Sequence, residues 1–456
     1  MIKSPRGTRD LLPPDTALWN FVEATVRDVF RAYNFHEIRT PIFESTELFA
    51  RGVGEDTDIV SKEMFTWEDP PRLFEQYKKF YQDVTAAIIE GRLPAGGYRP
   101  LSDLAGSQSL TLRPENTAGI VRAYIEHKLW ERGLNKFFSI GPMFRRERPQ
   151  KGRYRQFYQI DAEVIGPAAA GSQSPARDAE ILELVATLLD RVGITHWTLE
   201  LNSVGCPADR VKFNEALQQA LAPVVATMCA DCQRRAVTNP LRVFDCKVPQ
   251  DQPIIATLPT ISQFLDEACR THYEEVKQIL NSVEIPYVEN PRLVRGLDYY
   301  TRTAFEFTHG ALGAQNAILG GGRYDGLSEA LGGPPAPGIG FAIGEDRLVL
   351  TLSATASAES VVRQPDVYIA PLGAGMNREA ARVARELRRH DLVVDLGDES
   401  FRLKKSFEAA DKMGARYILI VGENEVAADA FALKHLASGE QLTIPRTELA
   451  QRILRK

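Results

Sequence analysis

The segment from Phe137 to Gly166 constrains the fold more than any other part of the chain, because two apolar runs flank a strongly basic stretch. Each run alternates in polarity with the period of two that is typical of β-strands. The stretch between them, Arg145 to Arg155, holds six basic residues and one acidic residue. This pattern predicts an antiparallel hairpin with a long basic tip.

The two faces of this predicted hairpin differ in chemistry. The second strand places on one face Tyr158, Ile160, Ala162 and Val164, and on the other Arg155, Phe157, Gln159, Asp161 and Glu163. A simply solvated sheet face explains most alternations of this kind. Here the flat ring of Phe157 would suit stacking, and a cluster of guanidinium groups binds phosphate through paired hydrogen bonds. The hairpin therefore indicates an anionic ligand, such as a nucleotide or a nucleic-acid end.

Composition excludes several classes of protein. A chain of 456 residues is long enough for roughly two to four domains. A net charge of −5 argues against a protein that coats nucleic acid, so any such contact should be local. No apolar run approaches the roughly 20 residues that cross a bilayer, and no apolar signal segment follows Met1. We therefore expect a cytoplasmic protein without a membrane partner.

The five cysteines do not form a familiar metal motif. Cys229 and Cys232 make one CxxC pair, with Cys246 further on and Cys206 upstream. A structural zinc site takes four ligands, commonly from two such pairs. With one pair present, we expect no metal site, and the odd number of cysteines favours reduced thiols over a disulfide framework.

Six motifs stand in the order typical of one enzyme family. The hairpin string FRRERPQKGRYRQFYQ resembles the second signature motif of class II aminoacyl-tRNA synthetases, in the form found in histidyl-tRNA synthetases. The other strings are RGTRDLLPPD, TLRPENTAG, RGLDYYTRTAFEF, GGGRYDGL and GIGFAIGEDRL. The resemblance covers nearly the whole chain. It implies a homodimeric histidine–tRNA ligase that activates L-histidine with ATP and Mg²⁺ and transfers it to tRNA(His).

The resemblance also implies the architecture. We expect an α+β catalytic domain built on an antiparallel sheet over residues 1–352, a linker at 353–365 and a C-terminal α/β anticodon-binding domain at 366–456. Two insertions in the catalytic domain are expected, at about 69–108 and, mainly helical, at about 205–290. In the last domain, strands that alternate with helices predict a mainly parallel sheet.

Glu115 and Thr117 follow a predicted strand that Pro114 ends. A carboxylate there is either a partner for a helix N-terminus or a receptor for an ammonium group. The resemblance favours the second and implies that Glu115 and Thr117 hold the amino group of histidine. The remaining residues that it implies around histidine are Gln159, Glu163, Arg295, Tyr299, Tyr300 and Tyr324.

Two arginines are implied to be catalytic. By resemblance, Arg145 binds the α-phosphate and the histidine carboxylate, and Arg295 stabilises charge from the other side. The residues implied to bind ATP are Arg145, Glu147, Phe157 (which would stack on adenine) and Arg347. A cation near a helix N-terminus opposes the helix dipole, so Arg347 also suggests a ligand role by itself.

Two alternatives share parts of this pattern. The regulatory subunit of ATP phosphoribosyltransferase resembles the same catalytic core without aminoacylation or the C-terminal domain. Synthetases for proline or threonine share the last domain. The string RGLDYY, both arginine motifs and the extra domain favour the histidyl family over these alternatives.

Overall fold

The computed structural model describes residues 2–54, 57–68, 79, 82, 83, 86, 89, 108–150, 152–313, 316–354 and 364–454. The chain divides into two compact units, Met1–Ala358 and Glu359–Lys456, which are treated separately below. The predicted limits of the linker and of the insertions stay predictions, and most of the insertion at 69–108 lies outside the described residues. Within the described part of the chain, no helix has the length and apolar character needed to span a membrane.

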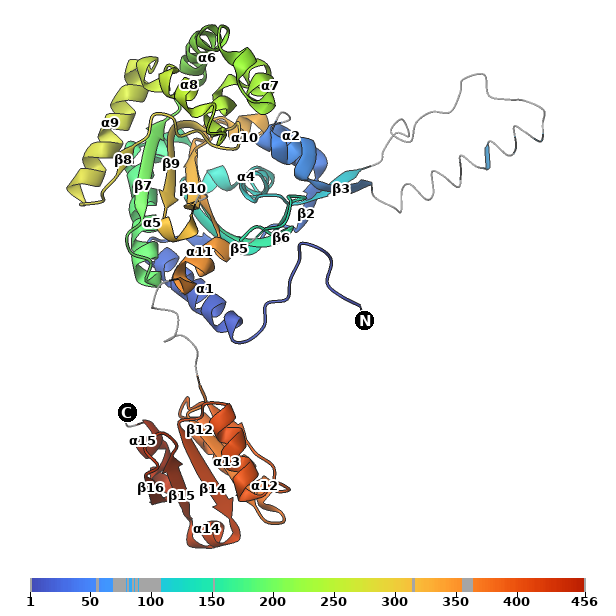
Figure 1. Cartoon of the computed structure of the whole chain (residues 1–456), viewed down its shortest axis with the longest axis vertical. Helices are drawn as coiled ribbons and strands as arrows, with labels where there is room; N and C mark the ends of the chain where they lie inside the picture. The colour runs from blue at the N-terminus through green and yellow to red at the C-terminus, as the bar shows by residue number, and fades with distance from the viewer. Residues whose placement is uncertain are drawn as a thin grey trace. The chain divides into compact units, whose positions relative to one another are not determined.

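The first unit is built on an eight-stranded sheet (Figure 1). Its strands, in spatial order, are β1 (His36–Glu37), β5 (Asn135–Phe144), β6 (Gln156–Ile165), β11 (Gly338–Gly344), β10 (Ala317–Arg323), β9 (Thr301–Thr308), β7 (Thr198–Ser203) and β8 (Val288–Glu289). The strands from β5 to β7 pair antiparallel, whereas β1 and β8 join the two edges in parallel. The prediction of a catalytic domain built on an antiparallel sheet is confirmed.

The hairpin forms as the sequence predicts. β5 and β6 pair without interruption from Asn135 opposite Ile165 to Phe144 opposite Gln156. On β6, the apolar set from Ile160 to Val164 is fully buried in the main core of the unit. Because side chains alternate along a strand, the polar set of β6 must point to the opposite face of the sheet.

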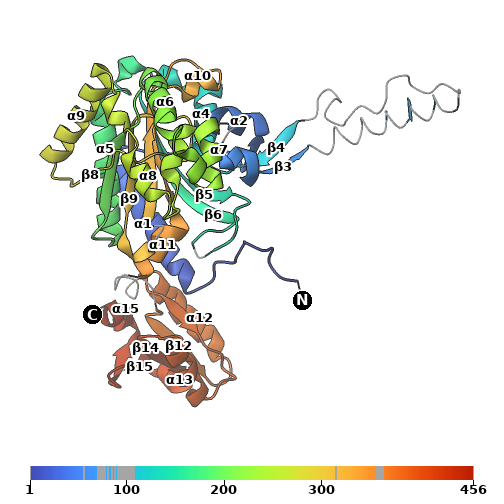
Figure 2. The ribbon, with the colours of Figure 1, turned by 45° about the horizontal axis from the view of Figure 1, so that its top comes forward.

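Helices cover the apolar face of this sheet. They are α1 (Asp15–Ala32), α5 (Pro175–Val192), α9 (Glu267–Ser282) and α11 (Glu345–Ser353). α5 has strong end signals: the Ser174 side chain accepts the Ala176 N–H, Pro175 opens the helix, and Gly193 follows it with φ of 88°. α5 and α9 lie side by side (Figures 1 and 2), and both contribute buried side chains to the core. The opposite, polar face is left for a site.

A second, three-stranded sheet leads into that polar face. Its order is β2 (Phe43–Ser45), β4 (Ser109–Leu112) and β3 (Phe65–Glu68). Pro114 follows β4, and α4 (Thr117–Glu126) begins three residues later. The predicted strand and helix around Glu115 are therefore both present, and Glu115 lies at the junction between them.

A helical group precedes β8 and β9 in the chain. It contains α6 (Pro207–Leu221), α7 (Ala230–Thr238), the 3₁₀ helix η6 (Pro240–Asp245) and α8 (Gln252–Thr257). Figure 1 shows α6, α7 and α8 gathered at the opposite end of the unit from α1 and α11. This group has a small hydrophobic core of its own, which includes Phe213, Leu217 and Val243.

The second unit is a five-stranded sheet with helices. Its strands, in spatial order, are β13 (Val394–Leu396), β12 (Val367–Leu372), β14 (Tyr417–Gly422), β15 (Ala430–His435) and β16 (Gln441–Pro445), and its main helices are α12 (Met376–Arg388) and α13 (Leu403–Lys412). The first three strands pair in parallel, but β15 and β16 are antiparallel. The prediction of a mainly parallel sheet is wrong because it missed these two strands, of which β16 has no fully buried residue to mark it.

Candidate active site

A cavity of about 180 Å³ lies on the polar face of the large sheet. Nine of the residues predicted for the site line it: Glu115, Thr117, Arg145, Gln159, Glu163, Arg295, Tyr299, Tyr300 and Tyr324. They come from segments that are far apart in the sequence, so the fold brings them together. The cavity is smaller than the ~300–1,000 Å³ of pockets for drug-sized ligands, which suits a ligand as small as one amino acid.

Glu115 combines the two interpretations that its position left open. Its carboxylate accepts hydrogen bonds from the N–H groups of Thr117 (2.8 Å) and Ala118 (3.0 Å), at the start of α4. It is therefore a helix N-terminal partner. The same carboxylate lines the cavity, and each of its oxygens can accept a further hydrogen bond. Burial raises the pKa of Glu115.

Glu163 is held in place by hydrogen bonds to both of its carboxylate oxygens. Its two oxygens accept hydrogen bonds from the Thr117 hydroxyl (2.7 Å) and the Tyr324 hydroxyl (2.6 Å). Burial, which outweighs these bonds, raises the pKa of Glu163 to about 8. Neighbouring Asp161 is also buried, and burial together with the charge of Glu115 raises its pKa to about 7. Such a group of carboxyls attracts a cationic ligand, which would favour their ionised forms.

Three glycines make room for site side chains. A β-carbon at Gly320 would overlap the guanidinium of Arg295, and one at Gly340 would overlap the carboxylate of Glu163. A β-carbon at Gly338 would likewise overlap the ring of Tyr324. The glycine run forms part of β10, which continues to Arg323, because an extended backbone beside the site requires residues without side chains.

Two guanidinium groups form the cationic part of the cavity wall. Arg145 is fixed by a hydrogen bond from Nε to the Pro114 carbonyl (2.9 Å), and its guanidinium carbon lies 5.2 Å from the ring centre of Phe157. Arg295 donates from Nη1 to Glu306 (2.6 Å). Sequence reasoning missed Glu306, and only its alternation on β9 could have placed it on the same face as the site.

The other predicted ATP residues lie beside this cavity rather than in its lining. Glu147 is 3.8 Å from Arg145 at the closest charged atoms, and Phe157 lies under Arg145. Arg347 donates from Nε to the Ala317 carbonyl (2.8 Å). Burial lowers the pKa of Arg347, and the carboxylates of Glu306 and Glu147 counteract this effect. These residues therefore form a second charged zone that continues from the arginines.

Two buried polar atoms of the cavity wall lack a hydrogen-bond partner within the described part of the chain. They are Oε1 of Gln159 and Nε of Arg295. A buried polar group without a partner costs about 1–3 kcal/mol. A ligand that supplied a donor to Gln159 would remove this cost.

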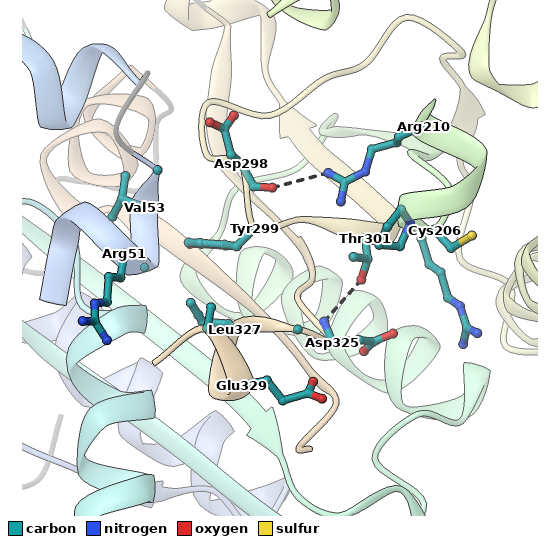
Figure 3. A pocket seen from close by; sticks show the side chains of 16 residues that line it. Arg51, Val53, Cys206, Arg210, Asp298, Tyr299, Thr301, Asp325, Leu327 and Glu329 are labelled. Carbon is teal, nitrogen blue, oxygen red and sulfur yellow. Dashed lines mark hydrogen bonds between the residues drawn. The ribbon is translucent and has the colours of Figure 1, made fainter. Parts of the chain in front are cut away.

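A larger cavity, of about 520 Å³, shares Tyr299 with the smaller one (Figure 3). Figure 3 shows Arg210 pointing to the backbone of Asp298, whose carbonyl accepts its hydrogen bond (3.4 Å). Arg51 also lines this cavity. Neither the buried Glu115 and Glu163 nor the two site arginines line it. The chemistry therefore points to the smaller cavity as the site.

The antiparallel sheet, the basic hairpin and the facing arginines define a class II aminoacyl-tRNA synthetase. A family model described as histidyl-tRNA synthetase matches residues 98–348, and one described as an anticodon binding domain matches residues 366–456. The chain belongs to the histidyl-tRNA synthetase family.

Relatives support this assignment along the whole chain. A histidine–tRNA ligase of Koribacter versatilis (strain Ellin345) is 65% identical over 99% of this chain and 95% of the relative. A histidine–tRNA ligase of Solibacter usitatus (strain Ellin6076) is 53% identical, over 99% of each chain. The crystal structure of apo Staphylococcus aureus histidyl-tRNA synthetase matches with a TM-score of 0.75 and 35% identity, covering 99% of this chain and 100% of that one.

These findings confirm the predicted family, fold class and enzyme class, a histidine–tRNA ligase. The alternatives of a regulatory subunit and of a synthetase for another amino acid lose their support, because the relatives that match end to end carry the ligase name.

Proposed function

We propose that the 180 Å³ cavity binds the amino acid, L-histidine, before its activation. The observation that carries this proposal is the convergence of nine predicted residues on one cavity in which the Gln159 oxygen lacks a partner. The amino group of histidine would lie at Glu115 and Thr117. Its imidazole would lie among Glu163 and the three tyrosines, which offer both hydrogen-bond acceptors and donors.

Selectivity for histidine would arise because a ligand without an imidazole would leave buried polar groups of the cavity without hydrogen-bond partners. Imidazole can donate a hydrogen bond from one nitrogen and accept one at the other. An apolar side chain of similar size would leave the buried Glu163 and Gln159 without these partners. A site built on such hydrogen bonds can reject an analogue that lacks the matching group by a factor of ~10⁴–10⁵.

Activation would require positioning and charge stabilisation. A carboxylate oxygen of histidine attacks the α-phosphorus of ATP, an oxygen–phosphorus bond forms, and pyrophosphate leaves with its electron pair. Arg145 and Arg295 would bind the reacting phosphate from two sides and stabilise its developing charge. The adenine ring would stack on Phe157, on the face that Arg145 leaves open, and Arg347 and Glu147 would contact other parts of ATP.

Magnesium would accompany ATP. Mg²⁺ prefers oxygen ligands and is usually held by substrate phosphates with one or two carboxylates. Glu147 and Glu306 are partly exposed, with side chains 19% and 24% accessible, and both act on Arg347. Their carboxylates fit this donor set and are the proposed protein ligands. When bound, Mg²⁺ would neutralise part of the triphosphate charge.

In the transfer of histidine to tRNA, the second unit would bind and select the tRNA. We propose that tRNA(His) contacts Phe401–Lys405, where Lys405 Nζ lies 3.6 Å from the ring centre of Phe401 and the neighbouring basic side chains are exposed. A hydroxyl of the terminal ribose would then attack the histidyl carbonyl and release AMP. We also propose that the chain acts as a homodimer in the cytoplasm. Light scattering of the purified chain would test the homodimer.

The decisive experiment is histidine-dependent exchange of pyrophosphate into ATP, with other amino acids as controls. We expect exchange with histidine alone. Arg295→Ala should lower the exchange rate by ~10²–10³ without unfolding the chain, since removing one charge-stabilising group has this effect. Arg51→Ala, in the larger cavity, should exchange normally. Exchange that depends on Arg51 and not on Arg295 would place the reaction elsewhere.

A further inference from the structure

Three thiols and one carboxylate meet in the helical group of the first unit. The side-chain ligand atoms of Cys229, Cys232, Cys246 and Asp251 all lie within 4.8 Å of one another. The Sγ atoms of Cys229 and Cys246 are 3.9 Å apart, and Cys246 Sγ is 3.3 Å from Asp251 Oδ2. The cluster is well enclosed: Cys232, Cys246 and Asp251 are buried, and Cys229 is half-buried.

These separations match a tetrahedral metal site. Zinc binds cysteine sulfur at about 2.3 Å, so two sulfurs on a tetrahedral ion lie about 3.8 Å apart. A disulfide requires a sulfur–sulfur distance of about 2.05 Å, which the pair at 3.9 Å does not approach. We propose that Cys229, Cys232, Cys246 and Asp251 form a structural zinc site with three sulfur ligands and one oxygen ligand.

Backbone groups around the cluster support the ligand forms of these side chains. The Cys232 N–H donates to Cys229 Sγ (3.5 Å), and the Val248 N–H donates to Cys246 Sγ (3.4 Å). The Cys229 N–H donates to both oxygens of Asp251 (3.2 and 3.1 Å). Hydrogen bonds of this kind orient metal ligands and stabilise their negative charge.

A divalent cation would also resolve the electrostatics of the cluster. In their ligand forms these groups bring four negative charges together in a largely buried place. A zinc ion offsets this repulsion and binds thiols in their deprotonated form.

The proposed ion would link three separate segments of the helical group. Cys229 caps α7, Cys246 follows η6, and Asp251 precedes α8. Small hydrophobic cores of this kind commonly need additional stabilisation, such as that from a bound metal ion. The group also contacts the segment that carries Arg295. Arg242 of η6 donates to the Gly296 carbonyl.

A second cluster in the same group has a simpler explanation. Cys206, Asp209, Asp266 and Cys269 also lie close together. There, Asp209 accepts the N–H groups of Cys206 (3.1 Å) and Asp266 (3.0 Å), and Asp266 accepts the Cys269 N–H (2.7 Å). These bonds cap α6 and α9, so helix capping accounts for this cluster and makes it a matched control.

The test is metal analysis of the full chain, expressed with zinc and purified under reducing conditions with a mild chelator. Mass spectrometry of the metal should find about one zinc per chain. Cys232→Ser and Cys246→Ser should each lower the zinc content by more than about tenfold. Cys206→Ser, in which serine can still cap α6, should keep the zinc.

Cobalt provides a measurement that does not depend on the folding of a variant. Replacing zinc with Co²⁺ in the unmodified chain should give thiolate-to-cobalt charge-transfer bands of an intensity expected for three thiolates, with the visible bands of a tetrahedral site. Absence of both zinc and these bands would overturn the proposal. So would a Cys229–Cys246 disulfide in the reduced preparation, or zinc that is lost in Cys206→Ser but kept in Cys246→Ser.

Discussion

The guanidinium of Arg295 lies against the backbone of Gly320, in a position that a β-carbon on residue 320 would overlap. These residues stand on different segments, and the glycine run of β10 gives the arginine its place in the cavity wall. The salt bridge of Arg295 to Glu306 (2.6 Å) holds the guanidinium there. Small residues in one strand thus determine the position of a charged group from another segment.

Gly320→Ala should displace Arg295 and slow histidine activation. Since the methyl group takes the place of the guanidinium, we expect a loss in pyrophosphate exchange approaching that of Arg295→Ala, ~10²–10³. Gly326→Ala is the control, because its added β-carbon would meet nothing within 4 Å. Normal exchange by Gly320→Ala would show that Arg295 does not need this position.

The titration of Glu163 should make the stability of the unliganded enzyme depend on pH. Its pKa rises from an ordinary 4.5 to about 8, so between these values the folded chain binds more protons than the unfolded chain. The free energy of unfolding should therefore fall as the pH rises through this window and level off above about pH 8.

Glu163→Gln should reduce this dependence, because the amide does not titrate. Urea unfolding, followed by tryptophan fluorescence at about pH 6 and about pH 8, measures it. Part of the slope should remain, since Asp161 also has a raised pKa, of about 7. Glu126→Gln, an exposed carboxyl on α4, should behave like the unmodified chain. If the free energy of unfolding changed equally with pH in Glu163→Gln and in the unmodified chain, the pH dependence would not come from Glu163.

Removing Arg323 should severely destabilise the first unit. Arg323 and Asp178 are completely buried and form a salt bridge, and the Asp178 carboxylate also accepts a hydrogen bond from His272 Nε2 (2.8 Å). Burial would raise the pKa of Asp178, but Arg323 and His272 outweigh burial and lower it to about 2. Arg323→Leu leaves this carboxylate buried without its main partner, which should cost about 3–5 kcal/mol.

Urea unfolding measures this loss, and all four tryptophans, at positions 19, 67, 130 and 197, lie in the first unit. Arg31→Ala is the comparison: its salt bridge with Asp28 (3.0 Å) is exposed and should contribute about 0–1 kcal/mol. Combining Arg323→Leu with Asp178→Asn should recover part of the stability. A loss in Arg323→Leu no larger than that in Arg31→Ala would refute a structural role for the buried pair.

Lys405→Ala should weaken tRNA binding without affecting activation. We expect a higher KM for tRNA in aminoacylation. The slope of log KM against log salt concentration should be smaller by about 0.7–0.9, which is the effect of losing one phosphate contact. Pyrophosphate exchange, which needs no tRNA, should be unchanged. An unaltered salt dependence would remove Lys405 from the RNA interface.

Local patterns in the sequence predicted many of the strands and helices and most of the residues that line the cavity. The alternation of β5 and β6 predicted which side of the hairpin enters the core, and Pro114 marked the end of the strand before Glu115. Motif order gave the family. The pattern failed for the last sheet, where β16 has no fully buried residue.

The sequence by itself determined most of the elements of this protein and the kinds of side chain at its site, because strand and helix periodicity and motif chemistry are local properties. Only the tertiary structure decided how those side chains meet. It placed Gly340 against Glu163, Glu306 beside Arg295, and Cys246 with Asp251 next to the single CxxC pair. Contacts between distant segments depend on packing in three dimensions, and no spacing along the chain encodes them directly.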